Sequence, residues 1–467
     1  MAQWADVDWA KQMYASADEA ILTSAVATIE NATANPAGGM SRFPGLRSFV
    51  SVPGSRVYLK PWNGDLYAAT DQGKLWRVSR TGVATDVTGV PISGGQRVIM
   101  DATDDRLLLA AGGPILQLLG RRTEVLSRDA PESTHVVHVD GYVIAIERWS
   151  QRFYHCAPGE YDSWDPLDVF SANAKSDALT AAIVTPYREL LLAGEESVEQ
   201  FERLPNGSQP FSRRWSTGEG VAYPYTLTSD KTGTYGVNPR HEFVRFAGQV
   251  SQEQGEPVGL VLSKIDDWSD AWAQSITMFG DPYVVLQAPN ATSQAYQTKG
   301  VTLLMNQRDR RWSFLYGFDR DRGCPTRYPA WSFASIWGRT FAGVAGGIAE
   351  VDMDTFEFMG EPAPFVVRSG HIDKFGPSRV DDLRLRIKRG VGQTGERAPQ
   401  IGLRVNRDNR GFGPFQWRPL GTEGQREMVI YFGGQGTAHT WQWEMRVTDP
   451  VDVQFVGMQA RVERLSW

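Results

Sequence analysis

Histidines and carboxylates are the side chains of this 467-residue chain that could hold a metal ion. His135 and His138 form an H-x-x-H pair, which would present two imidazoles to one metal if it lay on a helix. The surrounding sequence Thr-His-Val-Val-His-Val is typical of a β-strand. Residues three apart on a strand point to opposite faces. We therefore expect this pair to bind no metal.

An aspartate cluster is the second candidate. Asp162, Asp165 and Asp168 lie close enough to suggest calcium, but the segment lacks the glycine and the ligand spacing of a calcium loop. We expect a turn in which the Asp side chains bond the local backbone. No G-x-S-x-G, P-loop or H-E-x-x-H motif occurs in the chain. The sequence therefore predicts no catalytic residues, no cofactor and no metal.

The elements that would position any site come from a two-strand unit that recurs seven times. Each unit has a turn, an apolar run that suits a strand covered on both faces, a second turn that often contains Gly, and a strand of alternating character. The first unit comprises Gly64–Ala69 and Gly73–Val78. The units begin at residues 64, 105, 141, 188, 233, 300 and 338. Several short strands in a repeat of about forty residues are typical of a β-propeller.

The chain divides into three parts. Residues 1–48 lack the unit and form a short N-terminal arm, in which Ser16–Thr28 is expected to be helical. Residues 49–360 form the propeller, with a helix expected near residues 262–276 because apolar residues there follow helical spacing. Residues 361–467 are expected to form a small β-sandwich. Its five candidate strands are Asp382–Lys388, Ile401–Val405, Arg426–Phe432, Trp441–Val447 and Val451–Val462.

Composition agrees with an all-β fold, because 47 Gly and 26 Pro spread along the chain can separate many short strands. The net charge of −6 is unlike that of a basic nucleic-acid-binding protein. Two cysteines are too few for a disulfide framework. No apolar run approaches the roughly 20 residues of a membrane helix. The N-terminal residues also lack a signal pattern, so we expect synthesis in a cytoplasm.

The segment Ser41-Arg42-Phe43-Pro44-Gly45 stands just before the first blade. Pro44 fixes its own φ and biases Phe43 toward an extended conformation, while Gly45 permits a bend. Phe43 is then expected to be buried, either as an anchor of the arm against the propeller edge or within the first strand of blade one, which would close the propeller ring. Arg42 is expected to pair with a carboxylate of the same chain or of a neighbouring subunit.

This segment resembles the Arg-Ser-Phe-Pro-Gly type motif in the N-terminal arm of the tail hub proteins of short-tailed bacteriophages, also called packaged-DNA stabilisation proteins. Ser41 and Arg42 are exchanged relative to that motif. The resemblance extends over most of the chain. The other similar segments are residues 152–177, 196–201, 218–221 and 449–463.

The resemblance implies a structural virion protein that is not an enzyme. Proteins of this family form a ring, typically of six copies, below the portal and its adaptor. They help to retain the packaged DNA and carry the tail needle or nozzle and the tailspikes or tail fibres. Such a ring encloses DNA without sequence-specific binding, and it is made in the host bacterial cytoplasm before it joins the virion tail. Arg42, Phe43, Pro44 and Gly45 are then the expected arm and partner contacts.

Two other classes of propeller protein remain as alternatives. A propeller glycosidase or polysaccharide lyase would carry paired carboxylates at the mouth of the central channel. A cellular scaffold related to WD40 proteins would carry a recurring Gly-His…Trp-Asp signature, which the blades lack.

Overall fold

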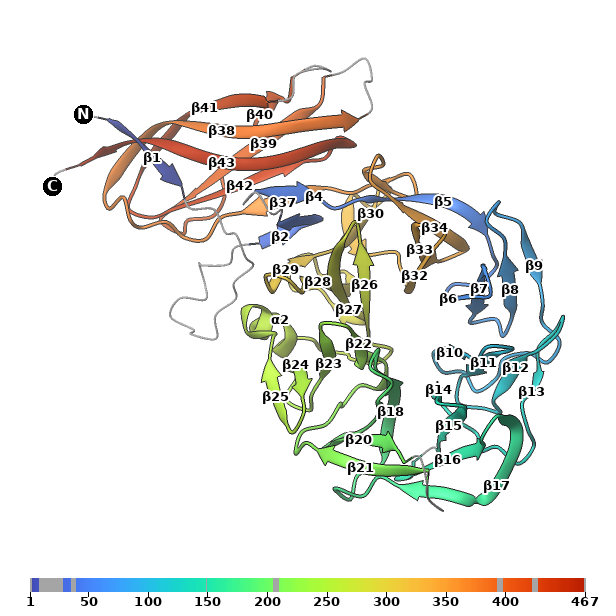
Figure 1. The fold of residues 1–467 in the computed structure, drawn as a ribbon. Coiled ribbons are helices and arrows are strands. Elements are labelled where there is room, and N and C mark those ends of the chain that lie inside the picture. The colour runs from blue at the N-terminus through green and yellow to red at the C-terminus, as the bar shows by residue number, and fades with distance from the viewer. Residues whose placement is uncertain are drawn as a thin grey trace.

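The computed structural model describes residues 2–7, 28–34, 39–147, 149–204, 210–392, 398–421 and 427–465. Most of these residues lie in short antiparallel strands, and the sheets from β6 to β34 stand around a common centre (Figure 1). Within the described residues these sheets form seven four-stranded blades. The predicted all-β fold with a seven-bladed propeller is therefore confirmed. Of the predicted helix at residues 16–28, only Thr28 lies within the described residues.

The first four blades follow the chain in order. Their strands are β6 (Val57–Trp62), β7 (Asp65–Thr70), β8 (Leu75–Val78) and β9 (Ala84–Asp86); β10 (Ile99–Ala102), β11 (Leu107–Ala110), β12 (Leu116–Leu118) and β13 (Glu124–Val125); β14 (Val136–Val139), β15 (Tyr142–Ile146), β16 (Arg152–Ala157) and β17 (Glu160–Ser171); and β18 (Leu179–Val184), β19 (Leu190–Gly194), β20 (Val198–Arg203) and β21 (Phe211–Ser216).

Blades 5 and 6 continue in the same order and are followed by a hairpin. The strands are β22 (Thr228–Asp230), β23 (Gly233–Val237), β24 (Phe243–Ala247) and β25 (Val250–Glu253); β26 (Trp272–Met278), β27 (Asp281–Thr292), β28 (Lys299–Asn306) and β29 (Arg311–Phe314); and the hairpin of β30 (Tyr316–Asp319) and β31 (Cys324–Arg327).

Blade 7 is completed by the N-terminal part of the chain. It contains β32 (Ser332–Ile336), β33 (Arg339–Val344) and β34 (Gly347–Asp352), and its outer strand is β5 (Gly45–Ser51). β5 runs antiparallel to β34, from the pair Gly347–Ser51 to the pair Asp352–Gly45. β5 also pairs in parallel with β35 (Glu357–Phe358), which is joined to β36 (Glu361–Pro362). The propeller ring is thus closed by hydrogen bonds between distant parts of the chain.

The predicted two-strand units match the second and third strands of the blades, except in blade 6, where they match the third and fourth. Their first strands are apolar because both faces are covered, and β11, β15 and β19 are buried at every position. The innermost strands, such as β6 and β10, lie outside the predicted units. These strands line the central channel and mix polar with apolar residues. Their hydrophobic pattern is therefore weaker than that of the fully buried second strands.

The insertion between blades 5 and 6 contains less helix than its spacing predicts. It has the turn η2 (Glu256–Val258) and the short helix α2 (Gly259–Ser263), whereas Trp272 and Ile276 belong to β26. A second turn, η1 (Pro224–Thr226), precedes blade 5. None of the helices in the described parts of the chain is long and apolar enough to cross a membrane.

The C-terminal domain is a sandwich of two sheets. One sheet has the order β3 (Ala32–Ala34), β4 (Met40–Arg42), β43 (Val451–Arg464), β38 (Ser378–Gly392), β41 (Glu427–Ala438), and β1 (Gln3–Val7) also pairs with β43. The other sheet includes β2 (Thr28–Glu30), β37 (Phe365–Arg368), β42 (Trp441–Val447), β39 (Gln400–Arg407) and β40 (Gln416–Pro419). All five candidate strands of the sequence analysis occur in these sheets.

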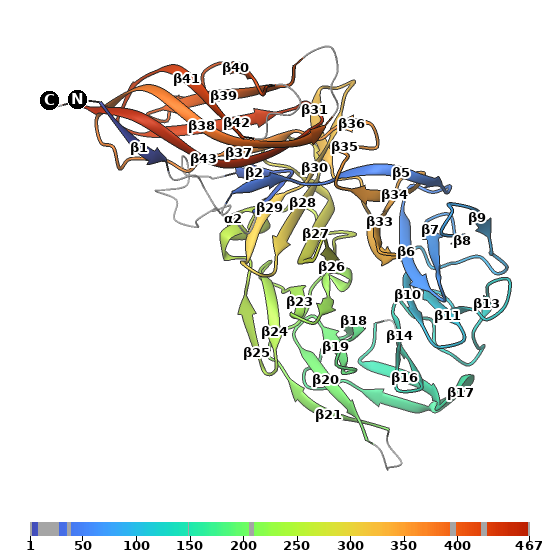
Figure 2. The same cartoon turned by 45° about the horizontal axis from the view of Figure 1, so that its top comes forward.

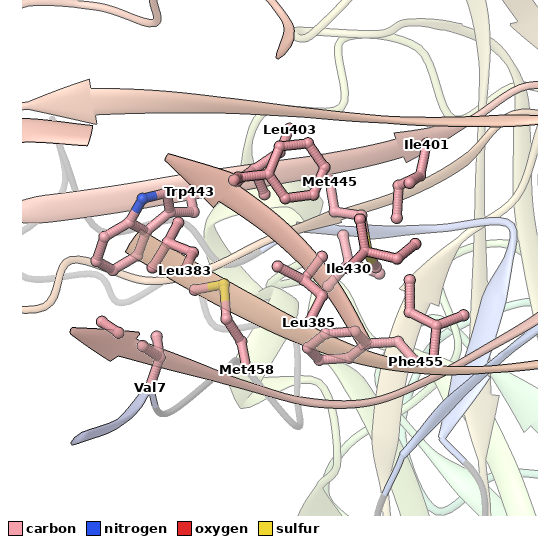
Figure 3. Close-up of a cluster of buried hydrophobic side chains, with 14 of the residues drawn as sticks. Val7, Leu383, Leu385, Ile401, Leu403, Ile430, Trp443, Met445, Phe455 and Met458 are labelled. Atoms are coloured by element: carbon pink, nitrogen blue, oxygen red, sulfur yellow. The ribbon is translucent and has the colours of Figure 1, made fainter. Parts of the chain in front are cut away.

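The sandwich core follows from alternation along its strands. Leu383, Leu385 and Ile387 of β38 point inward while the charged residues between them point outward. They face Trp443 and Met445 of β42 in the other sheet, as Figure 3 shows for Leu383 and Leu385. Val7 of β1 also lies in this core (Figure 3), so the beginning of the chain contributes to the domain formed by its end.

Strands of residues 1–48 connect the two domains. β2 pairs in parallel with β29 of blade 6 and antiparallel with β37, so that a nine-stranded sheet runs from the propeller into the sandwich. Both views place β2 between the two domains (Figures 1 and 2). The boundary predicted at residue 48 falls within β5. The arm strands are therefore parts of the two domains' sheets.

Candidate functional site

Arg42 lies at the meeting point of the arm, the propeller and the sandwich. Its Nη1 donates hydrogen bonds to the carbonyl oxygens of Asp449 at 2.5 Å and Val451 at 2.9 Å. Its Nη2 donates to the carbonyl oxygens of Phe356 at 3.2 Å and Ala363 at 2.5 Å. None of these acceptors is the same-chain carboxylate that the sequence analysis considered. One guanidinium group therefore fastens the end of the propeller to the start of β43.

Arg42 keeps its charge in this buried position. Burial lowers the pKa of Arg42 to about 10, and the nearby Asp452 and Asp449 carboxylates oppose that shift. At neutral pH the group is a cation, and hydrogen bonds from a cation are stronger than those between neutral groups. The Arg42 side chain is only 4% exposed, so its partners lie within this chain.

Phe43 is the apolar part of the same junction. It is 1% exposed and packs in a core cluster with Leu46, Tyr328 and Phe358. Its ring meets that of Tyr328 edge to face, with centroids 6.2 Å apart. Phe43 lies two residues before the first residue of β5, so it anchors the strand that closes the ring. The predicted burial of Phe43 is confirmed. The strand that follows it is the outer strand of blade 7, so the expectation that this segment is the first strand of blade one is wrong.

Pro44 and Gly45 lead into β5. The N–H of Gly45 donates to the carbonyl oxygen of Thr355 at 2.6 Å. A Cβ at this position would lie 2.4 Å from the same oxygen and 2.6 Å from the carbonyl oxygen of Glu357. The sequence predicts that Gly45 permits a bend, but its φ is not among the positive values of the described glycines. Close approach of two backbones is what requires glycine here.

Replacement of Gly45 by alanine should destabilise the protein by about 1–3 kcal/mol, the usual range for overpacking, because the obstructing atoms are backbone oxygens that cannot rotate away. Gly218→Ala is the matched control, since a Cβ at Gly218 meets nothing within 4 Å. Urea unfolding of both variants measures the difference. Equal stabilities would show that β5 can shift at little energetic cost.

Asn31 is a junction residue that the sequence did not single out. Its backbone has the left-handed φ of 51° that Asn tolerates better than most residues. Its Nδ2 donates to the carbonyl oxygens of Tyr316 and Pro364, both at 3.0 Å, and its Oδ1 accepts from the Tyr316 N–H at 2.9 Å. Its carbonyl oxygen accepts from the N–H of Phe43 at 2.8 Å. Asn31 thereby joins both domains to the Arg42–Gly45 segment.

Two buried carboxylates lie along the sheet that connects the domains. Burial raises the pKa of Glu30 above its ordinary value, although a hydrogen bond from the Tyr296 hydroxyl opposes the shift. Burial acts in the same direction on Glu444, but hydrogen bonds and charges from Arg404 and Arg368 outweigh it and hold the pKa of Glu444 below its ordinary value. Glu444 bonds arginines of the two strands that flank β42, and Glu30 bonds Tyr296 in the turn between β27 and β28, so both groups contribute to the rigidity of the junction.

The central channel of the propeller contains a cavity of about 460 Å³. Its walls come largely from the innermost strands, including β6, β10, β14 and β18. Asp101 is the carboxylate among the described lining residues. It pairs with Lys60 at 2.9 Å and accepts a hydrogen bond from the backbone N–H of His138 at 2.8 Å. The paired carboxylates expected of a propeller glycosidase do not meet in this lining.

The other chemical candidates have local roles. His135 stacks on Tyr225 with ring centroids 5.5 Å apart, and burial lowers its pKa to about 4. Asp162, Asp165 and Asp168 lie within the strand β17 and not in the predicted turn, although Asp165 accepts a hydrogen bond from the N–H of Leu167. The parts of the chain that the structure describes contain no cluster of three potential metal ligands.

Comparison with known proteins reaches only the level of the fold. No family model and no curated protein matches the sequence. Among solved structures, the chain is similar to a streptogramin B lyase (10% identity, TM-score 0.41, covering 66% of this chain and 97% of that one). It is also similar to BamB from Moraxella catarrhalis (14% identity, TM-score 0.38, covering 75% of this chain and 97% of that one). A third similar structure is the WD40 propeller domain of Doa1 (12% identity, TM-score 0.41, covering 66% of this chain and 97% of that one). We take neither activity nor partner from these likenesses.

Proposed function

We propose that this chain is a structural protein of a phage tail. In this proposal, copies of it form a ring below the portal and adaptor, help to retain the packaged DNA, and attach the needle or nozzle and the tailspikes or fibres. The chain itself catalyses no reaction. The proposal rests on the resemblance of Ser41–Gly45 and the other similar segments to the tail hub proteins.

The observation that carries the proposal is the position of this resembling segment. Arg42, Phe43 and Gly45 fasten the closing strand of the propeller to the sandwich, and β2 continues blade 6 into the same domain. A subunit held together in this way can transmit force between partners bound at different ends without its domains separating. That property supports the proposal that the chain is a connector between other tail proteins.

Charge and channel chemistry also support a structural function. A chain with a net charge of −6 has little attraction for DNA phosphates, so DNA can leave an enclosing ring without being held. Glycosidases need two carboxyl groups on either side of the scissile bond. The cavity lining described here supplies Asp101, already paired with Lys60, which favours the structural proposal over the glycosidase alternative.

The purified chain should bind a complex of its cognate portal and adaptor at micromolar concentration, because the proposed ring is built on that platform. Co-sedimentation followed by electron microscopy measures binding and copy number, and portal without adaptor is the control. Failure to bind the adaptor–portal complex would overturn the proposed function. So would hydrolysis or elimination of host capsular or lipopolysaccharide substrates that a single Asp or Glu substitution removes.

A further inference from the structure

The outer face of one sandwich sheet carries polar and aromatic side chains from both ends of the chain. Leu383, Leu385 and Met458 point into the sandwich core (Figure 3), so the residues next to them along β38 and β43 point outward. Arg384 of β38 and Gln459 of β43 are two of these outward residues, and they stand opposite each other in the sheet. Both side chains therefore lie on the solvent side of the sheet.

These two residues form the middle of a straight row across four strands. Asp6 of β1 stands opposite Gln459, and Tyr431 of β41 stands opposite Arg384. Hydrogen bonds join three members of the row. The Nε2 of Gln459 donates to Oδ1 of Asp6 at 2.6 Å, and the Nε of Arg384 donates to Oε1 of Gln459 at 2.5 Å. The Arg384 guanidinium is thus held in one orientation before any ligand binds.

Trp4 lies over this row. The Arg384 guanidinium contacts one face of the Trp4 ring, with its carbon 4.6 Å from the ring centroid. The ring of Tyr431 meets that of Trp4 at 66°, with centroids 6.5 Å apart. Trp4 is 40% exposed and Tyr431 is 54% exposed. Because Arg384 occupies one face of the indole, the opposite face is the one open to solvent. Trp4 and the row together form the outer patch.

A ligand on the outer patch can reach its central cation. The terminal Nη1 and Nη2 of Arg384 have no acceptor among the described residues, and neither belongs to the buried polar atoms that lack a partner. Both donors are therefore in contact with solvent. Within the parts of the chain that the structure describes, no carboxylate forms an ion pair with Arg384 at 4.0 Å or less. Its charge is thus available to an external anion.

The neighbouring charges leave this surface with a positive excess. Arg386, the next outward residue of β38, is exposed and likewise has no carboxylate partner among the described residues. Arg461 pairs with Asp382 at 3.5 Å. Lys388 pairs with Glu427 at 3.3 Å, so neither of these pairs adds net charge. Two free arginines against the one aspartate of the row make the surface complementary to an anion, although the whole chain has a net charge of −6.

The chemistry of the outer patch matches an acidic sugar. A pyranose ring has a face of C–H groups that can pack against the open face of Trp4. The carboxylate of a hexuronic acid accepts paired hydrogen bonds from a guanidinium, which Arg384 supplies. Sugar hydroxyls donate to carboxylates, and the exposed Asp6 lies at the end of the row. A neutral sugar would leave the cation unpaired, and an acidic peptide would bring no C–H face to the indole.

We propose that the outer patch binds an acidic polysaccharide, through hexuronic acid residues that stack on Trp4 and pair with Arg384. Arg386 lies two residues along β38, roughly 7 Å away, so it can pair with the carboxylate of a neighbouring sugar. Ion pairs at an exposed surface are individually weak, so affinity should rise with the number of sugars bound. No bond in the polysaccharide is cleaved. The proposal goes beyond the proposed tail function and does not rest on it.

Isothermal titration of the full chain with trigalacturonate tests the site. Maltotriose is the neutral sugar control, and triglutamate is an anion that lacks sugar rings. We expect trigalacturonate to bind at low salt with a Kd near or below about 1 mM, and the two controls to bind about tenfold more weakly. The proposal is overturned if trigalacturonate does not bind, or if triglutamate binds as tightly, since the site would then recognise charge alone.

Two substitutions in the outer patch test its residues. Trp4→Ala removes the stacking surface and Arg384→Met removes the cation, so each should weaken trigalacturonate binding about tenfold. Trp417→Ala and Arg77→Met are the matched controls, because they change an exposed tryptophan and an exposed arginine that lie outside the patch. Both control variants should bind as the natural chain does.

A third variant keeps the test decisive if the loss of Trp4 disturbs β1. Gly457 stands opposite Arg386, and a Cβ at Gly457 meets nothing within 4 Å. Gly457→Glu therefore adds a carboxylate beside the free arginines without removing a contact, and it should weaken trigalacturonate binding about tenfold. Circular dichroism establishes that each variant is folded. The proposal is overturned if folded Arg384→Met or Gly457→Glu binds trigalacturonate as the natural chain does.

Discussion

Replacement of Phe43 by alanine should lower the free energy of unfolding by about 3–5 kcal/mol, the range for truncation of a fully buried aromatic side chain. Phe43 is 1% exposed and packs against Leu46, Tyr328 and Phe358, so its removal leaves a cavity that the segments carrying these three residues would have to fill. Each of these segments is held in its own sheet or loop, which limits relaxation. Urea unfolding monitored by tryptophan fluorescence measures the loss.

The matched control for this change is Phe279→Ala. Phe279 is 52% exposed, and truncation of an exposed side chain usually changes stability by less than about 0.5 kcal/mol. A Phe43→Ala variant as stable as the Phe279→Ala variant would contradict the anchoring role of Phe43. A variant that loses the expected stability but retains binding to the adaptor–portal complex would separate folding from assembly.

Replacement of Arg42 by methionine should cost at least about 3 kcal/mol, because four carbonyl oxygens lose their donor and a buried acceptor without a partner costs about 1–3 kcal/mol. Methionine keeps most of the side-chain volume, so the change reports the lost hydrogen bonds more than a cavity. Lysine at this position keeps the charge but lacks the planar guanidinium, and it should restore only part of the stability.

Arg47→Met is the control for the Arg42 variants. Arg47 lies on the adjoining strand β5, is 59% exposed in its side chain, and pairs with Glu350 and Asp352 at the surface. Exposed ion pairs contribute about 0–1 kcal/mol, so this variant should unfold close to the natural chain. If Arg42→Met lowered the free energy of unfolding as little as Arg47→Met does, water would have to donate hydrogen bonds to the same four carbonyl groups.

The blades were predictable where burial on both faces makes a strand continuously apolar, as in β11, β15 and β19. The innermost strands were not predictable, because one side of each strand faces the channel and need not be apolar. Ile99–Ala102, for example, places Asp101 beside apolar residues. The arm strands β2, β3 and β4 have three residues each, which is too short for any periodicity to be recognised.

The candidate site was predictable in part. Pro44 and Gly45 constrain the backbone locally, and that was enough to infer that Phe43 is buried. The partners of Arg42 are carbonyl groups at residues 356, 363, 449 and 451, and backbone carbonyls leave no signal in a sequence. The requirement for glycine at residue 45 likewise comes from Thr355 and Glu357, which only the folded chain brings near.

The closing of blade 7 by β5 has a consequence for how the protein is made. Ser51 pairs with Gly347, and Gln3 pairs with Val462, so the first strands can find their places only after nearly the whole chain has left the ribosome. Contacts between such distant residues slow folding, because the chain must close very long loops before it gains their stabilising energy. Until then the apolar edges of blade 7 and β43 remain uncovered, and chains at high concentration can associate through them. Synthesis rate and chaperone capacity should therefore limit the yield of native protein more than the stability of the finished fold does.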